Sequence, residues 1–193
     1  MADDGKLTGL IASRVRQLRA AQNLSLEGLA KKSGVSRSMI SLIERAECSP
    51  TAVVLDKLAV ALGVTLASFF ERENGSAAEK GPVSRRSEQV EWRDPLSCYT
   101  RRNVSPARPR QPVQIVEVEF PAGARVTFET GARQARVCQQ IWILHGTMEI
   151  TIGQTTHRLG KGDCLAMELE APTVFHNPTK AASRYAVVIA SGF

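Results

Sequence analysis

Residues 24–45 have the sequence LSLEGLAKKSGVSRSMISLIER, which predicts two short helices joined by a tight turn. Ser25 and Ser36 each precede a helical segment, where a serine hydroxyl can accept a backbone N–H that has no partner inside the helix. Gly34 lies between the segments, and glycine readily adopts the left-handed backbone conformation that ends many helices. This stretch therefore predicts a helix-turn-helix.

The second helix of this pair has an apolar face and a polar face. Ile40 and Ile43 recur at helical spacing and are expected to be buried. Arg37, Ser38 and Ser41 fall on the other face, which is small, polar and basic. Such a face suits the DNA major groove, where a recognition helix presents its N-terminal residues to the base edges. A helical hairpin whose polar face is merely solvated remains the alternative from these residues alone.

The flanking sequence extends the pair into a bundle. Residues 7–23 repeat apolar side chains at helical spacing, with Thr8 as a candidate N-cap. After the pair, a further helix is expected to begin with Thr51 as its N-cap and to end at Gly63. A short last helix is expected over residues 65–71. These segments predict a five-helix bundle whose apolar stripes share one core.

With these neighbours, residues 10–70 resemble the phage-repressor or xenobiotic-response-element (XRE) family of helix-turn-helix domains. The resemblance rests on LAKKSGVSRSMISLIERAECSPT and LDKLAVALGV. It implies that the helix after the turn enters the major groove of double-stranded operator DNA. The residues to which the resemblance assigns DNA contacts are Arg37, Ser38 and Ser41 for the bases, and Lys31, Lys32, Arg45 and Thr51 for the phosphates.

Two other features of the helical region bear on this resemblance. Glu44 is expected to support the fold, paired with an arginine of the first helix such as Arg19. Many family members begin the helix before the turn with a glutamine that contacts DNA, whereas this chain has Leu26 and Glu27. The resemblance therefore assigns no DNA contact to the start of that helix.

Composition and charge agree with a two-domain globular chain. The chain has 193 residues, 43% of them hydrophobic, and its net charge of +6 lies entirely in the first 112 residues. The N-terminus lacks the basic and apolar segments of a signal peptide, and no apolar run approaches the roughly 18 residues of a membrane span. We therefore expect a cytoplasmic protein without a membrane partner.

The four cysteines show neither a CxxC motif nor the spacing of metal ligands: Cys48, Cys98, Cys138 and Cys164. Reduced, mostly buried thiols are expected, and a redox pair of Cys138 and Cys164 stays open.

The second half of the chain differs from the first in its pattern. Residues 73–88 are rich in Gly, Ser and charge, and predict a linker between a helix-turn-helix domain at 1–72 and a second domain at 89–193. In the second domain, short apolar segments alternate with Pro and Gly, which is typical of β-sandwiches and small barrels. The fold class expected is therefore α + β with two domains.

The segment QIWILHGTMEITIGQTTHRLGKGDCLAMELEAPTVFHNP is similar to a cupin, a double-sheet jelly-roll β-barrel. The glycines and the pair Gly162-Asp163 carry this resemblance, which extends over residues 90–193. An XRE domain followed by a cupin resembles a class of bacterial transcription regulators.

Cupin enzymes usually bind a metal through three histidines and a glutamate. Here Gln139 falls in the position of the glutamate, and Thr173 replaces one histidine. The positions of the two paired histidines fall within residues 132–135, which contain no histidine. Amides and a hydroxyl do not supply the donors that hold such a metal, so we expect no metal, no cofactor and no enzyme activity. The chain's histidines are interpreted as surface or hydrogen-bonding residues: His145, His157 and His176.

A barrel without a metal still offers a concave, largely apolar site for a small molecule. Gln139 and Thr173 are expected to point inward because they occupy ligand positions, with Gln134 and Phe175 as further candidates for an effector pocket. The alternative is a barrel filled by its own side chains, which serves as a dimerisation module. Trp142 suits an interface, a core or a ligand platform.

The sequence thus predicts a transcription regulator that binds operator DNA as a homodimer, with a possible small-molecule effector in the cupin. A twofold pair reads two half-sites about one helical turn apart, which a single small domain does not. Two rival functions stay open: a metal-dependent cupin enzyme with an attached helix-turn-helix, and an antitoxin-like module that binds a protein.

Overall fold

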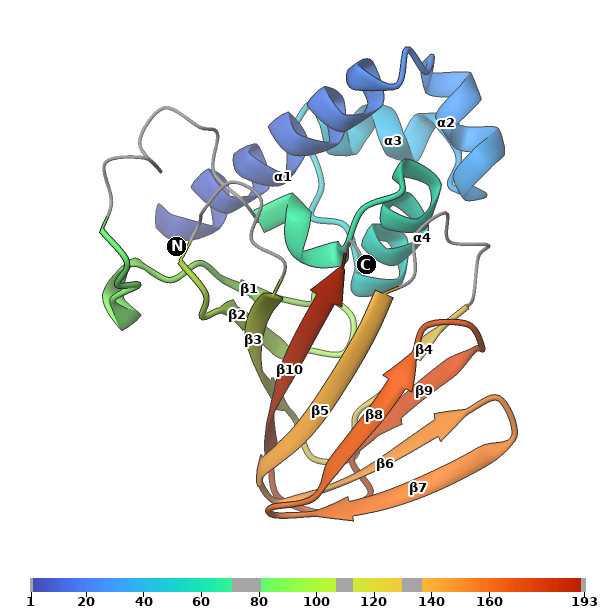
Figure 1. Cartoon of the computed structure of the whole chain (residues 1–193). Coiled ribbons are helices and arrows are strands. Elements are labelled where there is room, and N and C mark those ends of the chain that lie inside the picture. The colour runs from blue at the N-terminus through green and yellow to red at the C-terminus, as the bar shows by residue number, and fades with distance from the viewer. Residues whose placement is uncertain (1, 71–80, 107–112, 130–136, 192–193) are drawn as a thin grey trace.

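The computed structural model describes residues 2–70, 81–106, 113–129 and 137–191. Residues 2–70 form a helical unit, here called the head, and the strands after residue 90 form a β domain (Figure 1). The head consists of α1 (Ala2–Ala21), α2 (Leu26–Ser33), α3 (Arg37–Glu44), α4 (Ala52–Leu62) and the 3-10 helix η1 (Leu66–Phe70). Among the described helices, none is long and apolar enough to cross a membrane.

The helix ends follow the predicted caps. The hydroxyls of Ser25 and Ser36 accept the backbone N–H of Gly28 and Met39 at 3.0 and 3.2 Å, at the starts of α2 and α3. Gly34 ends α2 with a left-handed backbone at φ 69°. The prediction for α1 was wrong at one point: the helix begins at Ala2, so Thr8 lies inside the helix and is not its N-cap.

A buried ion pair joins α1 to the end of α3. Arg19 Nε and Nη2 lie 2.6 and 2.8 Å from the two carboxylate oxygens of Glu44, whose side chain is 7% exposed. Arg19 Nη1 also donates to the carbonyl oxygen of Leu24, and the bond to Glu44 raises the pKa of the arginine. The predicted pairing is confirmed, and it fixes α3 against α1 at the point where the chain enters α2.

The predicted fifth α-helix is a 3-10 helix. In η1 the side chains of Ala67, Phe69 and Phe70 are buried. With three residues per turn, Ala67 and Phe70 lie on the same side of a 3-10 helix, so both face the core in a segment too short for a stable α-helix. The described part of the head therefore contains four α-helices and one 3-10 helix.

The β domain contains two antiparallel sheets. A short 3-10 helix, η2 (Arg86–Glu88), precedes them. The strands are β1 (Glu91–Arg93), β2 (Thr100–Asn103), β3 (Val113–Phe120), β4 (Arg125–Phe128), β5 (Val137–His145), β6 (Thr147–Ile152), β7 (Thr155–Gly160), β8 (Cys164–Glu168), β9 (Thr173–His176) and β10 (Ser183–Ser191). Six strands pair in the order β1-β2-β3-β10-β5-β8, and four in the order β4-β9-β6-β7.

The double-sheet arrangement was predicted, but the closed barrel was not found. Among the described strands, no ladder joins the six-stranded sheet to the four-stranded one. The chain instead passes between sheets through tight connections such as Gly146, which has φ 79° and lies against Ser183, where a Cβ would approach Ser183 Oγ to 2.5 Å. Side-chain packing between the sheets closes the structure, because Phe120 and Tyr185 of one sheet and Phe175 of the other join one core.

Strand alternation corrects the expectation for the cysteines. Cys98 and Cys164 are exposed, Cys48 and Cys138 are half-buried, and all four are free. Cys164 pairs with Trp142, which is 50% exposed, so both side chains point away from the domain interior. The inward positions of these strands belong to neighbours such as Ile141, whose side chain is fully buried.

Asp94 joins the head to the β domain. Its carboxylate is buried in the turn between β1 and β2 and accepts the backbone N–H of Ala52, the first residue of α4, at 2.7 Å. The other carboxylate oxygen accepts the backbone N–H and the hydroxyl of Ser97, both at 2.6 Å. A carboxylate is favoured at a helix N-terminus, where backbone N–H groups lack partners.

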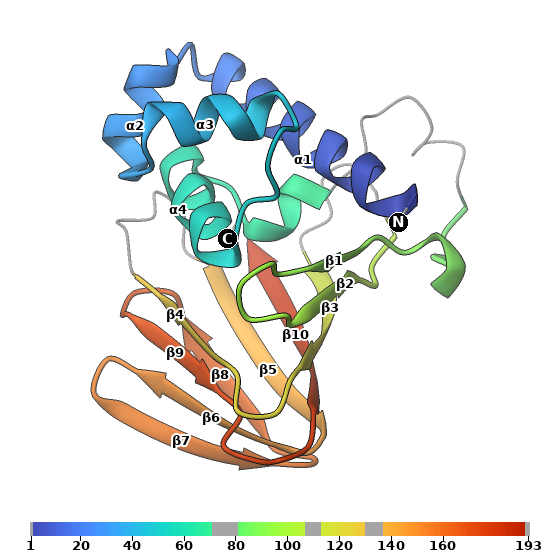
Figure 2. The same cartoon turned by 180° about the vertical axis from the view of Figure 1, so that it is seen from behind.

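Aromatic packing continues this junction into the β domain. Phe70 at the end of the head contacts Trp92, whose ring meets Tyr99 edge-on. Tyr99 in turn stacks on Phe120, with ring centroids 5.4 Å apart. The views from front and back place α4 directly over the ends of β5 and β10 (Figures 1 and 2). The head therefore covers one end of the space between the two sheets.

The junction yields a prediction for Asp94→Ala. The substitution leaves the N–H groups of Ala52 and Ser97 without their acceptor, so the free energy of unfolding should fall by about 1–3 kcal/mol. Urea denaturation measures the change. Ser97→Ala is the control, because it removes a single hydroxyl and should cost less. An Asp94→Ala value within about 0.5 kcal/mol of the wild type would contradict the role given to this carboxylate.

Candidate nucleic-acid interface and interdomain cavity

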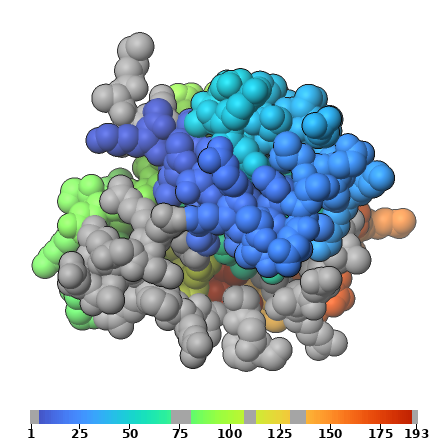
Figure 3. Space-filling model, turned by 90° about the horizontal axis from the view of Figure 1, so that it is seen from above, coloured from blue at the N-terminus to red at the C-terminus, as the bar shows by residue number. Residues whose placement is uncertain are grey.

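The outward face of α3 carries the predicted base-reading residues. Arg37 and Ser38 are exposed and Ser41 is half-buried, while Ile40 and Ile43 face the core. The helices α1, α2 and α3 form most of the surface seen from above, on the side away from the β domain (Figure 3). The base-reading face of α3 is thus accessible and is not packed against the β domain.

Electrostatics at the start of α3 favour an anion. The first turn of α3 contains no acidic residue, so the partial positive charge of the helix N-terminus adds to that of Arg37. Within the described part of the chain, Arg37 makes no ion pair. This arrangement leaves the guanidinium available to a phosphate or to the acceptor edge of a base.

The predicted phosphate-binding residues differ in their exposure and in the interactions that they already make. Lys31 and Lys32 are exposed in the last turn of α2, where they also complement the helix dipole. Arg45 is exposed and forms a surface ion pair with Glu47 at 3.0 Å. The hydroxyl of Thr51 accepts the backbone N–H of Val54 at 3.3 Å and so caps α4.

Met39 on α3 is accessible to solvent, and the sequence pattern did not identify it as a candidate DNA contact. Met39 is 36% exposed, and its sulfur lies 3.9 Å from the thiol of Cys48. An exposed, large apolar side chain beside a polar helix face is the signal that marks it. Helical spacing alone did not separate Met39 from the residues that face the core.

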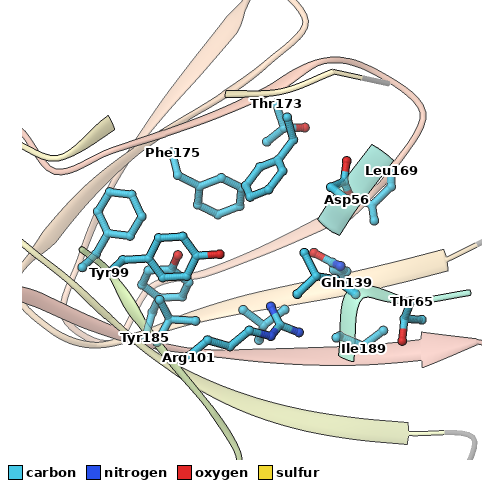
Figure 4. Close-up of a pocket in the computed structure, with 15 residues that line it drawn as sticks. Asp56, Thr65, Tyr99, Arg101, Gln139, Leu169, Thr173, Phe175, Tyr185 and Ile189 are labelled. Atoms are coloured by element: carbon cyan, nitrogen blue, oxygen red, sulfur yellow. The ribbon is translucent and has the colours of Figure 1, made fainter. Parts of the chain in front are cut away.

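A cavity of about 70 Å³ lies between the two sheets and the head. Three predicted pocket residues line it: Gln139 on β5, and Thr173 and Phe175 on β9. Figure 4 shows Thr173 and Phe175 across the cavity from Gln139. The fourth predicted residue, Gln134, lies outside the described residues.

Strand register explains why Gln139 reaches the cavity. Gln139 pairs with Ile189 of β10 and with Met167 of β8, and both of these side chains are buried. Opposed residues of an antiparallel pair point to the same side of the sheet, so Gln139 shares the inner face. On the other sheet, the Phe175 ring stacks on Tyr185 with centroids 6.0 Å apart.

The head supplies part of the cavity wall. Asp56 of α4, together with Thr65 and Leu66 near η1, lines the same space as the β-domain residues. Thr65 Oγ1 also donates to Gln114 Oε1 on β3 at 3.4 Å. The cavity therefore lies at the interface between the head and the β domain, which the sequence did not indicate.

Arg101 is the polar residue of the cavity that the sequence did not reveal. Its side chain is 9% exposed, and burial lowers the pKa of the guanidinium, an effect opposed by Tyr99, Tyr185 and Asp56. Burial also raises the pKa values of Tyr99 and Tyr185, so both phenols stay neutral. The sequence shows two adjacent arginines, Arg101 and Arg102. Which of them points inward is decided by the register of β2 in the sheet.

The histidines do not converge on the cavity. His176 Nδ1 lies 3.1 Å from a carboxylate oxygen of Glu149, on strands β9 and β6 of the four-stranded sheet. Within the described ranges, no three His, Cys, Asp or Glu side chains gather in a group able to hold a metal ion. Asn177, which directly follows β9, is fully buried, and its amide nitrogen donates to the carbonyl oxygens of Phe120, Pro121 and Ala181.

Comparison with known proteins places the head in a family. Residues 15–69 match the family described as helix-turn-helix. An uncharacterized HTH-type transcriptional regulator of Methanocaldococcus jannaschii, MJ0272, is 37% identical over 62 residues, which cover 32% of this chain and 94% of the relative. The HTH-type transcriptional regulator SutR of Escherichia coli is 39% identical over 64 residues, 33% of this chain but only 36% of that relative.

Two further proteins are similar over almost the whole chain. The HTH-type transcriptional regulator PuuR of Escherichia coli is 26% identical over 185 residues, which cover 95% of each protein. The crystal structure of an HTH_3 family transcriptional regulator from Vibrio cholerae superposes with a TM-score of 0.77 at 24% identity, over 98% of this chain and 99% of that one. This likeness shows a shared fold that includes both head and β domain. With its helix-turn-helix match and these relatives, the chain belongs to the XRE-type helix-turn-helix family of transcriptional regulators.

Proposed function

We propose that this regulator binds operator DNA as a homodimer through the outward face of α3, and that the interdomain cavity binds a small effector. The observation that carries the DNA-binding part is the accessible N-terminus of α3, where Arg37 is exposed and has no ion pair among the described residues. In this proposal the β domain binds ligand and partner subunit and performs no catalysis.

The residues of the head divide into base and phosphate contacts. Arg37 is suited to the two acceptors of a guanine edge, and the hydroxyls of Ser38 and Ser41 to bases on either side. Met39 offers an apolar contact to a thymine methyl group. The phosphate contacts are assigned to Lys31, Lys32, Arg45 and Thr51, which position the head without reading sequence.

The outer face of the six-stranded sheet is the proposed dimer surface. Trp142 is 50% exposed on β5, and Val113 and Ile115 are each 39% exposed on β3. The register places Ile115 opposite Val188 and Trp142 opposite Ala186, so these side chains share one face. A contiguous apolar face of this kind is typical of an interaction surface, and a second copy of the chain would supply the second half-site reader.

Effector control follows from where the cavity lies. A ligand in a space walled by both α4 and the β domain contacts two parts of the protein at once. Such a ligand changes DNA binding if its affinity differs between two placements of the head, and the coupling is reciprocal. We therefore propose that cavity occupancy biases the spacing of the two heads in the dimer.

Arg37→Ala tests the proposed base contact. On an operator selected from random sequence with the wild-type protein, the substitution should weaken binding about 5- to 150-fold and relax preference at one base pair, because a bidentate base contact is lost. Fluorescence anisotropy measures the affinity. Lys161→Ala, which removes an exposed cation between β7 and β8, is the control and should bind like the wild type.

Salt dependence separates a DNA reader from a protein-docking bundle. For wild type, the affinity should fall steeply with salt, and Lys31→Ala should reduce the slope by about 1. Affinity that ignores salt, or that survives Arg37→Ala and Ser41→Ala together, would contradict the proposed interface.

A separate prediction concerns the dimer surface. Trp142→Glu places a charge in the apolar contact and should shift the protein from dimer to monomer in sedimentation velocity at micromolar concentration. Val83→Glu is the matched control, since Val83 is 54% exposed but lies before η2 and outside the sheet. A Trp142→Glu protein that remains dimeric would exclude this face as the interface.

A further inference from the structure

Arg101 presents one open edge to the cavity. Its Nε and Nη2 atoms are buried and have no hydrogen-bond partner within the described structure. These two nitrogens form one side of the planar guanidinium, and their N–H bonds point in the same direction. A side of this kind is the fork that binds the two oxygens of a carboxylate.

The adjacent arginine shows that this fold can satisfy a buried guanidinium. Arg102 is 8% exposed, and its Nη2 lies 2.7 Å from Glu117 Oε1. Its Nη1 also donates to Gln89 Oε1. The two arginines occupy consecutive positions of β2 and point to opposite sides of the sheet. Arg102 therefore has partners within the chain, whereas Arg101 faces the cavity with Nε and Nη2 unpartnered among the described residues.

An unpaired buried guanidinium is costly, because burial removes its water without supplying an acceptor. Asp56 lies close enough to Arg101 to favour its charged form, yet it leaves Nε and Nη2 without an acceptor. Figure 4 shows the Arg101 guanidinium extending toward Gln139, another residue that lines the cavity. An acceptor for these two nitrogens would have to lie in this space.

The cavity limits the size and nature of that molecule. About 70 Å³ corresponds to roughly five water molecules, since one water needs about 10–15 Å³. Apart from a few polar groups such as Gln139 and Thr173, the walls are mostly aromatic and aliphatic, with Phe120, Phe128 and Phe175 among them. The space suits a few heavy atoms with one anionic end and one apolar end.

We infer that the cavity binds a small aliphatic monocarboxylate, whose two oxygens accept hydrogen bonds from Nε and Nη2 of Arg101 and whose apolar end packs against the phenylalanines. A monocarboxylate adds one negative charge beside Arg101 and Asp56, whereas a phosphate dianion would add two in a largely apolar site. The inference deepens the proposed effector site and rests on that part of the proposed function.

The test uses propionate as the probe and propionamide as its neutral isostere, at constant ionic strength with chloride as the balancing anion. Saturating propionate should raise the Tm of the full-length protein by about 3 °C or more, and isothermal titration should give one site per chain. Propionamide and inorganic phosphate should produce no saturable shift. Absence of a propionate effect, or a larger effect of phosphate, would overturn the inference.

Arg101→Met and Arg102→Met supply matched variants. Without ligand, Arg101→Met should have a Tm equal to or above that of the wild type, since it removes an unpaired buried charge, whereas Arg102→Met should lower the Tm by breaking satisfied pairs. Arg101→Met should also lose the response to propionate. A loss of stability as large as that of Arg102→Met, or an unchanged response to propionate, would contradict the open-edge assignment.

The head variant separates this inference from DNA binding. Arg37→Ala alters the proposed DNA contact and leaves the cavity intact, so it should bind propionate like the wild type. If the wild-type protein binds propionate but no DNA, only the proposed DNA binding is contradicted. If it binds DNA sequence-specifically but has no propionate site, only the inferred carboxylate site is contradicted.

Discussion

The bond from Ala52 N–H to the Asp94 carboxylate sets the position of the head on the β domain. This carboxylate caps the start of α4 from the turn between β1 and β2, and Ser97 holds its second oxygen. The same turn leads directly into β2, which carries Arg101. One hairpin therefore both anchors α4 and presents the open guanidinium to the cavity, while α4 supplies Asp56 to the cavity wall.

Within the head, this anchor is connected to the DNA-reading helix by packing and by one ion pair. Side chains of α1, α3 and α4 join a single core, in which Val15, Ile40 and Leu55 are fully buried. The pair between Arg19 and Glu44 fixes the end of α3 against α1. Because packed cores resist gradual deformation, a shift at α4 would move the head as a unit and would change the placement of α3 in a dimer.

Local sequence predicted the features that depend on neighbouring residues. The caps at Ser25, Ser36 and Gly34 and the buried face of α3 follow from rules that act within one or two turns of helix. The cupin resemblance placed Gln139 and Thr173 in ligand positions and added Phe175 as a candidate, and all three line the cavity. The closed barrel failed because it needed long-range information, whereas the N-cap at Thr8 and the burial of Cys164 were wrong at the level of local structure.

Arg101 illustrates this limit most clearly. Two consecutive arginines on one strand look alike in sequence, and only pairing with β1 and β3 decides which meets Glu117 and which meets the cavity. The role of the head in the cavity wall depends likewise on Asp94, a residue far from α4 along the chain. Neighbouring residues in the sequence predict neither the position of Arg101 at the cavity nor the bond from Ala52 to Asp94. The site between the two domains could therefore be recognised only in the three-dimensional structure.

The central claim is that occupancy of the cavity at Arg101 alters DNA binding by the head. The most direct measurement is the Kd of the wild-type protein for its selected operator, with and without saturating propionate at fixed ionic strength. The account predicts a change of about fivefold or more, which Arg101→Met abolishes while retaining the affinity of the unliganded wild type. An identical operator Kd in both conditions, with calorimetry showing propionate bound, would contradict the claim.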